Sequence, residues 1–185
     1  METTQHSLTV IIMQAQKGDS AAMQALYQQY SKAMFSTCTR MMGTKEDAED
    51  VLQEAFIMTF KNLHQLKEAA QFGGWLKRIV VNECIRHCKK KIATSGWEEY
   101  GEQHEQPMDD SIHWWEQVGM EQIHTQIKTL PDGCRQIFTL YAVENYSHRD
   151  IAESLGVSES TSKSQYHRAK QLLRERILLV VSGKS

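Results

Sequence analysis

The sequence predicts an all-α protein in which two small helical domains are joined by an acidic flexible linker. The chain has only two prolines in 185 residues. Ala, Gln, Glu, Lys, Leu and Met, which lose little rotamer freedom in a helix, are abundant, and runs of β-branched residues are few. Apolar residues recur three and four positions apart over most of the chain, as one face of a helix requires.

Charge divides the chain into three parts. Residues 1–91 hold 12 Lys and Arg against 9 Asp and Glu, residues 92–118 hold none against 7, and residues 119–185 hold 9 against 7. The middle part has no sustained period and contains Gly and Pro, so we expect a solvated linker there. The predicted domains are therefore residues 1–91 and 119–185.

Helical periodicity places four helices in the first domain. They are expected at residues 8–16, 20–42 and 45–63, and from Trp75 to about residue 91. Thr44 is expected to cap the third helix, with Asp47 three positions on. Residues 63–74 break the period and end in two glycines, which predicts a loop that could carry specificity residues.

The second domain is expected to contain helices at residues 118–130 and 132–143, broken at Pro131, followed by a helix-turn-helix. Gly156 can adopt the left-handed conformation that ends a helix, and Ser158 is a natural cap for the next one. Any amphipathic helical hairpin shows a similar period. The fixed offsets of Ala152, Gly156 and Ser158 favour the DNA-binding motif.

The second helix of this motif is expected to expose hydrogen-bonding groups and positive charge. Such a face suits the major groove of DNA and its flanking phosphates. The residues expected on it are Ser160, Thr161, Lys163, Ser164, Gln165, His167 and Arg168.

The helix that begins at Trp75 has a basic side next to aromatic residues. Bases stack on rings and phosphates meet cations, so single-stranded DNA could bind there. A solvated helix with Trp75 in the core is equally compatible with this stretch alone. The residues concerned are Phe72, Trp75, Lys77, Arg78, Asn82 and Arg86.

The helix at residues 45–63 has an outer side that mixes acids with one apolar residue. Carboxylates near a helix start compensate its dipole. Exposed Ile57 among polar neighbours, however, suits a partner surface. The outer residues are Asp47, Asp50, Gln53, Glu54 and Ile57.

Other functional classes find little support. No apolar run approaches the ~20 residues that span a bilayer, and the first residues lack a basic segment and a cleavage site, so we expect a cytoplasmic protein without membrane insertion. The four cysteines form no CxxC pair. Cys84, His87 and Cys88 lie within one helical turn, but no second pair stands at zinc-site spacing, so neither a metal nor a cofactor is expected. No phosphate loop, HExxH or nucleophile elbow points to an enzyme.

The order of these parts resembles the sigma-70 family of bacterial transcription initiation factors, in its short extracytoplasmic-function (ECF) form. DAEDVLQEAFIMTFKNL at 47–63 looks like the segment that docks on the clamp helices of the RNA polymerase beta-prime subunit. FGGWLKRIVVNECIRHCKK at 72–90 looks like the segment that melts and reads the −10 element. Residues 130–177 are similar to the domain that reads the −35 element. The resemblance covers nearly the whole chain.

This resemblance implies a non-enzymatic subunit that recruits RNA polymerase core, through its beta-prime and beta subunits, and opens promoter DNA. The outer residues of 45–63 would bind the polymerase clamp. The basic side after residue 72, together with a base-capturing loop that includes His64 and Lys67, would hold the −10 strand. The exposed face after Ser158 would read the −35 duplex. An anti-sigma factor that covers the polymerase-binding surfaces is a further implied partner.

The sequence departs from the family pattern at four places. Ser162 stands where many members have an aliphatic residue and Tyr166 where they have Leu, which leaves the orientation of that helix open. Glu68 stands where a turn often has Gly and cannot adopt a positive φ as cheaply. Arg86 replaces a common Asp. The alternative is an autonomous helix-turn-helix repressor or activator with an N-terminal dimerisation or sensor domain, which would form a homodimer and bind a palindromic site.

Overall fold

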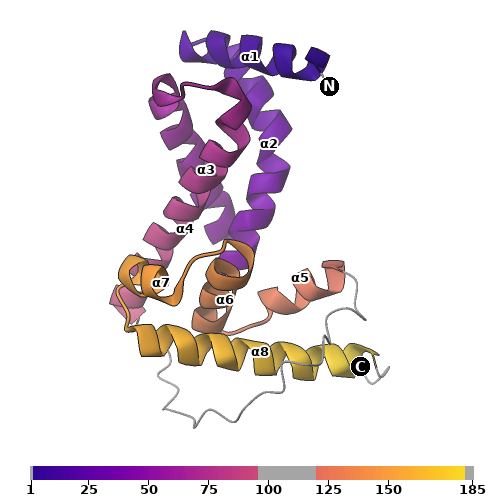
Figure 1. The fold of residues 1–185 in the computed structure, drawn as a ribbon, viewed down its shortest axis with the longest axis vertical. Coiled ribbons are helices and arrows are strands. Elements are labelled where there is room, and N and C mark those ends of the chain that lie inside the picture. Colours follow the sequence, from indigo (N-terminus) through magenta and orange to yellow (C-terminus); the bar gives the residue numbers. More distant parts are fainter. Residues whose placement is uncertain (1, 96–119, 182–185) are drawn as a thin grey trace. The chain divides into compact units, whose positions relative to one another are not determined.

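The computed structural model describes residues 2–95 and 120–181, and every regular element in these ranges is helical (Figure 1). The all-α prediction is confirmed. The elements before residue 96 are α1 (Glu2–Gln16), α2 (Ser20–Met41), α3 (Lys45–Asn62), the short 3₁₀ helices η1 (Leu63–Gln65) and η2 (Ala69–Gln71), and α4 (Phe72–Ser95). After residue 119 come α5 (Met120–Lys128), α6 (Asp132–Phe138), the π-helical turn η4 (Thr139–Val143), α7 (His148–Leu155) and α8 (Glu159–Val181).

The described residues form two compact units. The first contains residues 2–39 and 44–87, and the second contains residues 40–43, 88–95 and 120–181. α4 itself continues to Ser95, past the domain boundary predicted at residue 91. Most of the predicted linker, residues 96–118, lies outside the described residues, and so do its three tryptophans, Trp97, Trp114 and Trp115.

The core of the first unit joins α2, α3 and α4. The apolar stripe of each helix supplies it, because positions three and four apart share one face. Aromatic contacts tie the helices together: Tyr27 of α2 lies edge-on to Phe56 of α3, and Tyr30 of α2 lies edge-on to Phe72 of α4. The fully or nearly fully buried residues include Leu26, Cys38, Val51, Ala55, Phe56, Phe72, Leu76, Val80 and Cys84.

The start of α4 differs from the prediction. The expected loop was to end in Gly73 and Gly74, but α4 begins at Phe72 and includes both glycines in its first turn. The first N–H groups of a helix need no intrahelical partner, so that turn tolerates weak helix formers. Burial of the Phe72 ring, which is 0% exposed, offsets their entropic cost.

The second unit is organised along α8, against which α5, α6 and α7 pack (Figure 1). A buried cluster of Ile127, Leu130, Cys134, Ala169 and Leu173 joins α5, α6 and α8. The helix predicted over residues 132–143 is present, but its second half is π-helical. Tyr146 N–H bonds the Leu140 carbonyl, and the chain then enters the helix-turn-helix.

Candidate nucleic-acid interface

The turn between α7 and α8 is held by hydrogen bonds at both of its ends. The Ser147 hydroxyl accepts a bond from the Asp150 N–H at 3.1 Å, and the Asp150 carboxylate accepts one from the Ser147 N–H at 3.3 Å. α7 ends at Gly156, whose φ is 76°, and the Gly156 and Val157 N–H groups both donate to the Ala152 carbonyl. The prediction that Gly156 ends the first helix of the motif is confirmed.

Ser158 caps α8, as predicted. Its Oγ accepts a hydrogen bond from the Thr161 N–H at 2.9 Å, and it lies 2.7 Å from Thr161 Oγ1. One turn on, Lys163 Nζ lies 2.8 Å from Glu159 Oε1. The cap gathers hydroxyl and ammonium groups at the N-terminal end of α8, the end from which a recognition helix contacts base edges.

α8 exposes most of the residues predicted for DNA contact, with one exception. Gln165 is 6% exposed, and its Oε1 accepts a hydrogen bond from the Cys134 thiol at 3.0 Å. The expectation that Gln165 is exposed is wrong, because Ser162, Gln165 and Ala169 follow one another three and four positions apart on the packed side of α8. The remaining predicted residues, each at least partly exposed, are Ser160, Thr161, Lys163, Ser164, His167 and Arg168.

Phe72 and Trp75 differ in accessibility. The Phe72 ring is fully buried, with its centroid 5.0 Å from that of Tyr30 and 6.3 Å from that of Trp75. The expectation that Phe72 offers a surface to DNA is therefore wrong, because Phe72 shares the inner side of α4 with Leu76 and Val80 at helical spacing. Trp75 is partly exposed.

The outer side of α4 forms a stripe that we call the α4 stripe: Trp75, Arg78, Asn82 and Arg86. These residues stand three or four positions apart, so they lie on one face. Arg78, Asn82 and Arg86 are exposed. Lys77, also predicted to contact DNA, is partly buried and points away from the stripe by helical spacing. The partly exposed ring of Trp75 therefore lies at the start of a row of side chains that can donate hydrogen bonds.

Arg86 connects the α4 stripe to α3. Its Nε donates to Glu83 at 2.8 Å, and its Nη2 contacts both Glu83 and Glu54. Hydrogen bonding to Glu83 and the charge of Glu83 raise the pKa of the Arg86 guanidinium; desolvation opposes them, and the charge of Glu54 adds a lesser increase. The Glu54–Arg86 ion pair thus joins a residue predicted to bind the polymerase to one predicted to bind DNA.

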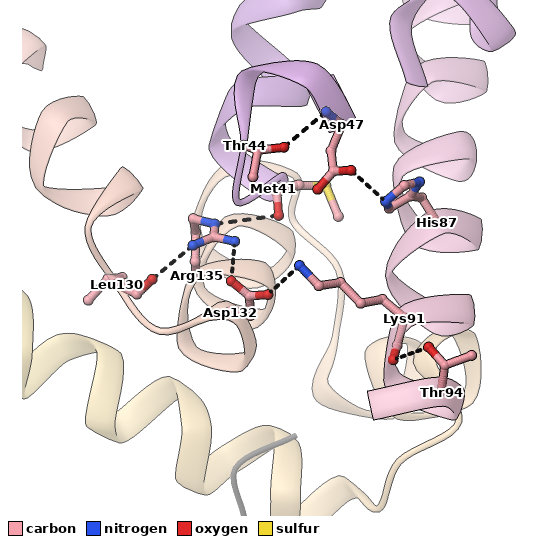
Figure 2. Close-up of polar contacts among 9 residues, drawn as sticks. All are labelled: Met41, Thr44, Asp47, His87, Lys91, Thr94, Leu130, Asp132 and Arg135. Atoms are coloured by element: carbon pink, nitrogen blue, oxygen red, sulfur yellow. Dashed lines mark hydrogen bonds and ion pairs between the residues drawn. The ribbon is translucent and has the colours of Figure 1, made fainter. Parts of the chain in front are cut away.

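The outer side of α3 carries the residues predicted to face a protein partner. Thr44 caps the helix as expected, its Oγ1 accepting from the Asp47 N–H at 3.1 Å. Asp47 is partly exposed, and its carboxylate lies 3.6 Å from His87 Nε2 (Figure 2). Ile57 is 46% exposed, as expected, and Met58 beside it is 39% exposed. The predicted residues that are exposed are Asp50, Gln53, Glu54 and Ile57.

The segment between α3 and α4 is more regular than the predicted loop. Gln16 Nε2 of α1 donates to the Leu63 and Leu66 carbonyls at 3.0 and 3.1 Å, which anchors the segment to α1. Glu68 has φ −122° and ψ 115°, an extended conformation that any residue adopts. Having Glu rather than Gly at this position therefore causes no backbone strain. The predicted residues His64 and Lys67 are both exposed.

A buried polar cluster surrounds Arg135, which the sequence left without a role (Figure 2). Arg135 is 3% exposed, and it donates to the Leu130 carbonyl at 2.9 Å, to Asp132 Oδ1 at 2.6 Å and to the Met41 carbonyl at 3.4 Å. Lys91 Nζ lies 3.0 Å from Asp132 Oδ2. Burial would raise the pKa of Asp132, but hydrogen bonds from Lys91 and Arg135 outweigh it and lower that pKa. The i, i+3 spacing of Asp132 and Arg135 was the available sequence signal.

Within residues 2–95 and 120–181, no three His, Cys, Asp or Glu side chains are grouped to hold a metal ion. Cys84 and Cys88 are buried, and burial is the main factor that raises the pKa of the Cys88 thiol to about 12. A thiol with that pKa is protonated at neutral pH. No described helix is both long and apolar enough to cross a membrane.

Models of known protein families match both units of the chain. The family model for Sigma-70 region 2 matches residues 26–93, and that for Sigma-70, region 4 matches residues 120–173. ECF RNA polymerase sigma factor SigW of Bacillus subtilis is 29% identical, over 90% of this chain and 94% of its own. ECF RNA polymerase sigma factor SigE of Mycolicibacterium smegmatis is 30% identical, over 85% of this chain and 63% of its own. A chain in the structure of CnrH in complex with the cytosolic domain of CnrY is 18% identical, with a TM-score of 0.46 over 95% of this chain and 97% of that one.

Proposed function

Because this chain belongs to the sigma-70 family, in its extracytoplasmic-function subfamily, and is an RNA-polymerase-binding, promoter-specific initiation factor, we propose that three surfaces divide this task. The outer side of α3 binds the polymerase clamp. The α4 stripe and the segment before it hold the −10 strand. The exposed face of α8 reads the −35 duplex. Sigma factors are non-enzymatic, so the polymerase supplies the catalytic groups, and the chain acts in the cytoplasm beside it.

The observation that carries the −10 assignment is the α4 stripe. A partly exposed ring at Trp75 can stack an unpaired base, and Arg78 and Asn82 follow at the spacing that lets them reach the adjoining backbone. His64 and Lys67 are exposed just before α4 and extend the same role. Phe72 is left out of the contact set because it is buried, and it supports Trp75 from within the core.

The −35 assignment depends on the exposed end of α8. Ser160, Lys163 and Ser164 are exposed directly after the Ser158 cap, where the first turns of a recognition helix enter the major groove. His167 and Arg168 lie a turn further on and suit phosphates. Loss of Lys163 is expected to weaken the use of all −35 sequences, whereas loss of a base-reading hydroxyl changes the preference among them.

The outer side of α3 has the composition of a protein interface rather than of a solvated face. Ile57 and Met58 are exposed together, and Asp50 and Glu54 precede them on the same side. An apolar centre with charged neighbours is typical of a docking surface for one specific partner. An anti-sigma factor that covered Ile57 would exclude the polymerase clamp helices by occupying the same residues.

Transcription in vitro with purified core polymerase on a library of promoter fragments tests the proposal. The chain is expected to direct initiation from fragments that share a −35 and a −10 sequence. Arg78→Ala is expected to reduce open-complex formation, and Lys163→Ala to reduce −35-dependent use, while substitution of the exposed α7 residue Glu153, Glu153→Gln, serves as the control. Initiation sites that stay the same with and without the chain would refute the proposal.

The same material separates this function from that of an autonomous regulator. Each domain carries only a small net positive charge, so we expect the chain alone to bind promoter DNA weakly. Core polymerase should tighten binding because it lets the −10 and −35 contacts form together. Fluorescence anisotropy of labelled promoter DNA, with and without core, measures the difference. A tight, sequence-specific complex of a homodimer on a palindrome would favour the regulator.

A further inference from the structure

The two unusual residues of α8 share one neighbour. Ser162 and Tyr166 stand four positions apart on the packed side of α8, and both contact His148, the first residue of α7. Ser162 is 0% exposed, and its Oγ lies 2.9 Å from His148 Nδ1. The His148 and Tyr166 rings meet edge to face, with centroids 5.6 Å apart and an interplanar angle of 64°.

His148 itself is held by a second aromatic contact. Its ring is stacked on that of Tyr141 from η4, with centroids 4.3 Å apart and planes 15° from parallel. The Tyr141 ring also lies 4.6 Å from that of Tyr166, and Phe138 of α6 stacks on Tyr166 at 5.8 Å. Residues from α6, η4 and α7 therefore surround Tyr166, and His148 is the one that also bonds α8 at Ser162.

This geometry constrains the rotation of α8 about its own axis. A hydrogen bond weakens steeply as its angle departs from the favoured direction, and aromatic pairs prefer particular geometries. Two directional contacts one turn apart fix the rotation better than aliphatic packing at the same positions would. Thr161 and Lys163 flank Ser162 in sequence, so the direction in which they leave the helix is set by the direction in which Ser162 enters the core.

We propose that His148 is a positioning residue for −35 recognition: through Ser162 and Tyr166 it sets the rotation of α8, and thereby which −35 bases the exposed face of α8 prefers. The inference rests on the proposed function of α8. His148 is partly buried beneath that face and is assigned no contact with DNA.

The test compares variants as holoenzymes with core RNA polymerase on a promoter library in which only the −35 element is randomised. His148→Phe keeps a stacking ring and removes Nδ1. Ser162→Ala removes the partner hydroxyl. His148→Asn places an amide near the position of Nδ1 and serves as the conservative variant, and Glu153→Gln on α7 is the matched control. Thermal unfolding followed by circular dichroism identifies a temperature at which every variant is folded, and the assays are run at that temperature.

His148→Phe is expected to change the relative use of −35 sequences by about fivefold or more, the effect of misaligning one base contact. Ser162→Ala should shift the preference in the same direction, and the double variant no further than the larger single change, because both remove one interaction. His148→Asn should retain more of the parent preference than His148→Phe. The control should leave it unchanged.

Variants that melt at lower temperature but keep the parent's −35 preference would overturn the inference, because a purely structural role predicts that result. Additive shifts in the double variant would also overturn it. Lys163→Ala distinguishes this failure from failure of the proposed function. If Lys163→Ala reduces −35-dependent transcription while His148→Phe leaves the preference unchanged, only the positioning role fails. If neither variant alters −35 use, the assignment of α8 fails as well.

Discussion

Phe72 and Trp75 are neighbours with opposite predicted roles, and substituting each in turn tests the proposed −10 surface. Phe72 is fully buried against Tyr30, whereas Trp75 is partly exposed at the start of the α4 stripe. If Phe72 supports the core and Trp75 stacks a base, Phe72→Leu should affect stability and Trp75→Ala should affect strand binding. The pair is informative because both rings belong to the first turn of α4.

The expected magnitudes separate the two roles. Phe72→Leu keeps an apolar side chain of similar volume and is expected to cost about 1 kcal/mol, or about 4–8 °C in Tm for a unit of this size. Phe72→Ala would cost about 3–5 kcal/mol and endanger folding, so the milder change is preferred. Trp75→Ala should lower the affinity for the −10 strand by about 5- to 150-fold, because stacking contributes about 1–3 kcal/mol per base.

Scanning calorimetry of the chain measures Tm, and anisotropy of a labelled −10 fork DNA with the holoenzyme measures strand affinity. Measurements are made at a temperature where both variants are folded. A Phe72→Leu variant that lost strand affinity as strongly as Trp75→Ala, with an unchanged Tm, would refute the assignment of Phe72 to the core. Unaltered strand affinity in Trp75→Ala would remove Trp75 from the site.

Three further perturbations have defined outcomes. Glu54→Gln removes an exposed ion pair with Arg86 and should change stability by less than about 1 kcal/mol, yet weaken core polymerase binding in a titration; Glu49→Gln, which removes an exposed ion pair with Lys45 on another side of α3, should not weaken it. Gly156→Ala places a Cβ at φ 76° and should cost about 1–2 kcal/mol in urea unfolding, whereas Gly74→Ala, with open space around its Cβ in α4, should not destabilise. Burial and then Lys163 lower the pKa of His148, against Glu159, so its contribution to stability is present above the unfolded pKa of about 6.5 and is lost as pH falls below it. Melting of His148→Phe should therefore depend less on pH across this range, and an equal dependence in both proteins would contradict the assignment.

The sequence determined the helices and their ends because the signals for them are local. The Ser158 cap, the Gly156 stop and the Thr44 cap each act on N–H and C=O groups within a few residues, so residue type at a fixed offset was enough. The exposed α3 surface with Ile57 was also predictable, since the apolar stripe of a helix fixes which side is left outside. The order of such segments likewise identified the family.

Which polar and aromatic residues face inward depends on long-range packing and is evident from the folded chain alone. Gln165 and Phe72 were predicted to be exposed because they can contact DNA, but Gln165 bonds Cys134 and the Phe72 ring packs on Tyr30. The partners come from other helices, at separations along the chain that no local pattern encodes. Arg135 is a third example, because its bond to the Met41 carbonyl joins residues 94 positions apart, whereas its bonds to Asp132 and to the Leu130 carbonyl are local.

The same limit applies to α8. The sequence placed a recognition helix after Ser158 and left its rotation open at Ser162 and Tyr166. The structure supplied the partner, His148, which lies 14 residues from Ser162 along the chain and 2.9 Å from its hydroxyl oxygen. Local chemistry determines that a helix forms and where it ends, whereas the face that it turns toward DNA depends on long-range contacts that exist only once the chain has folded.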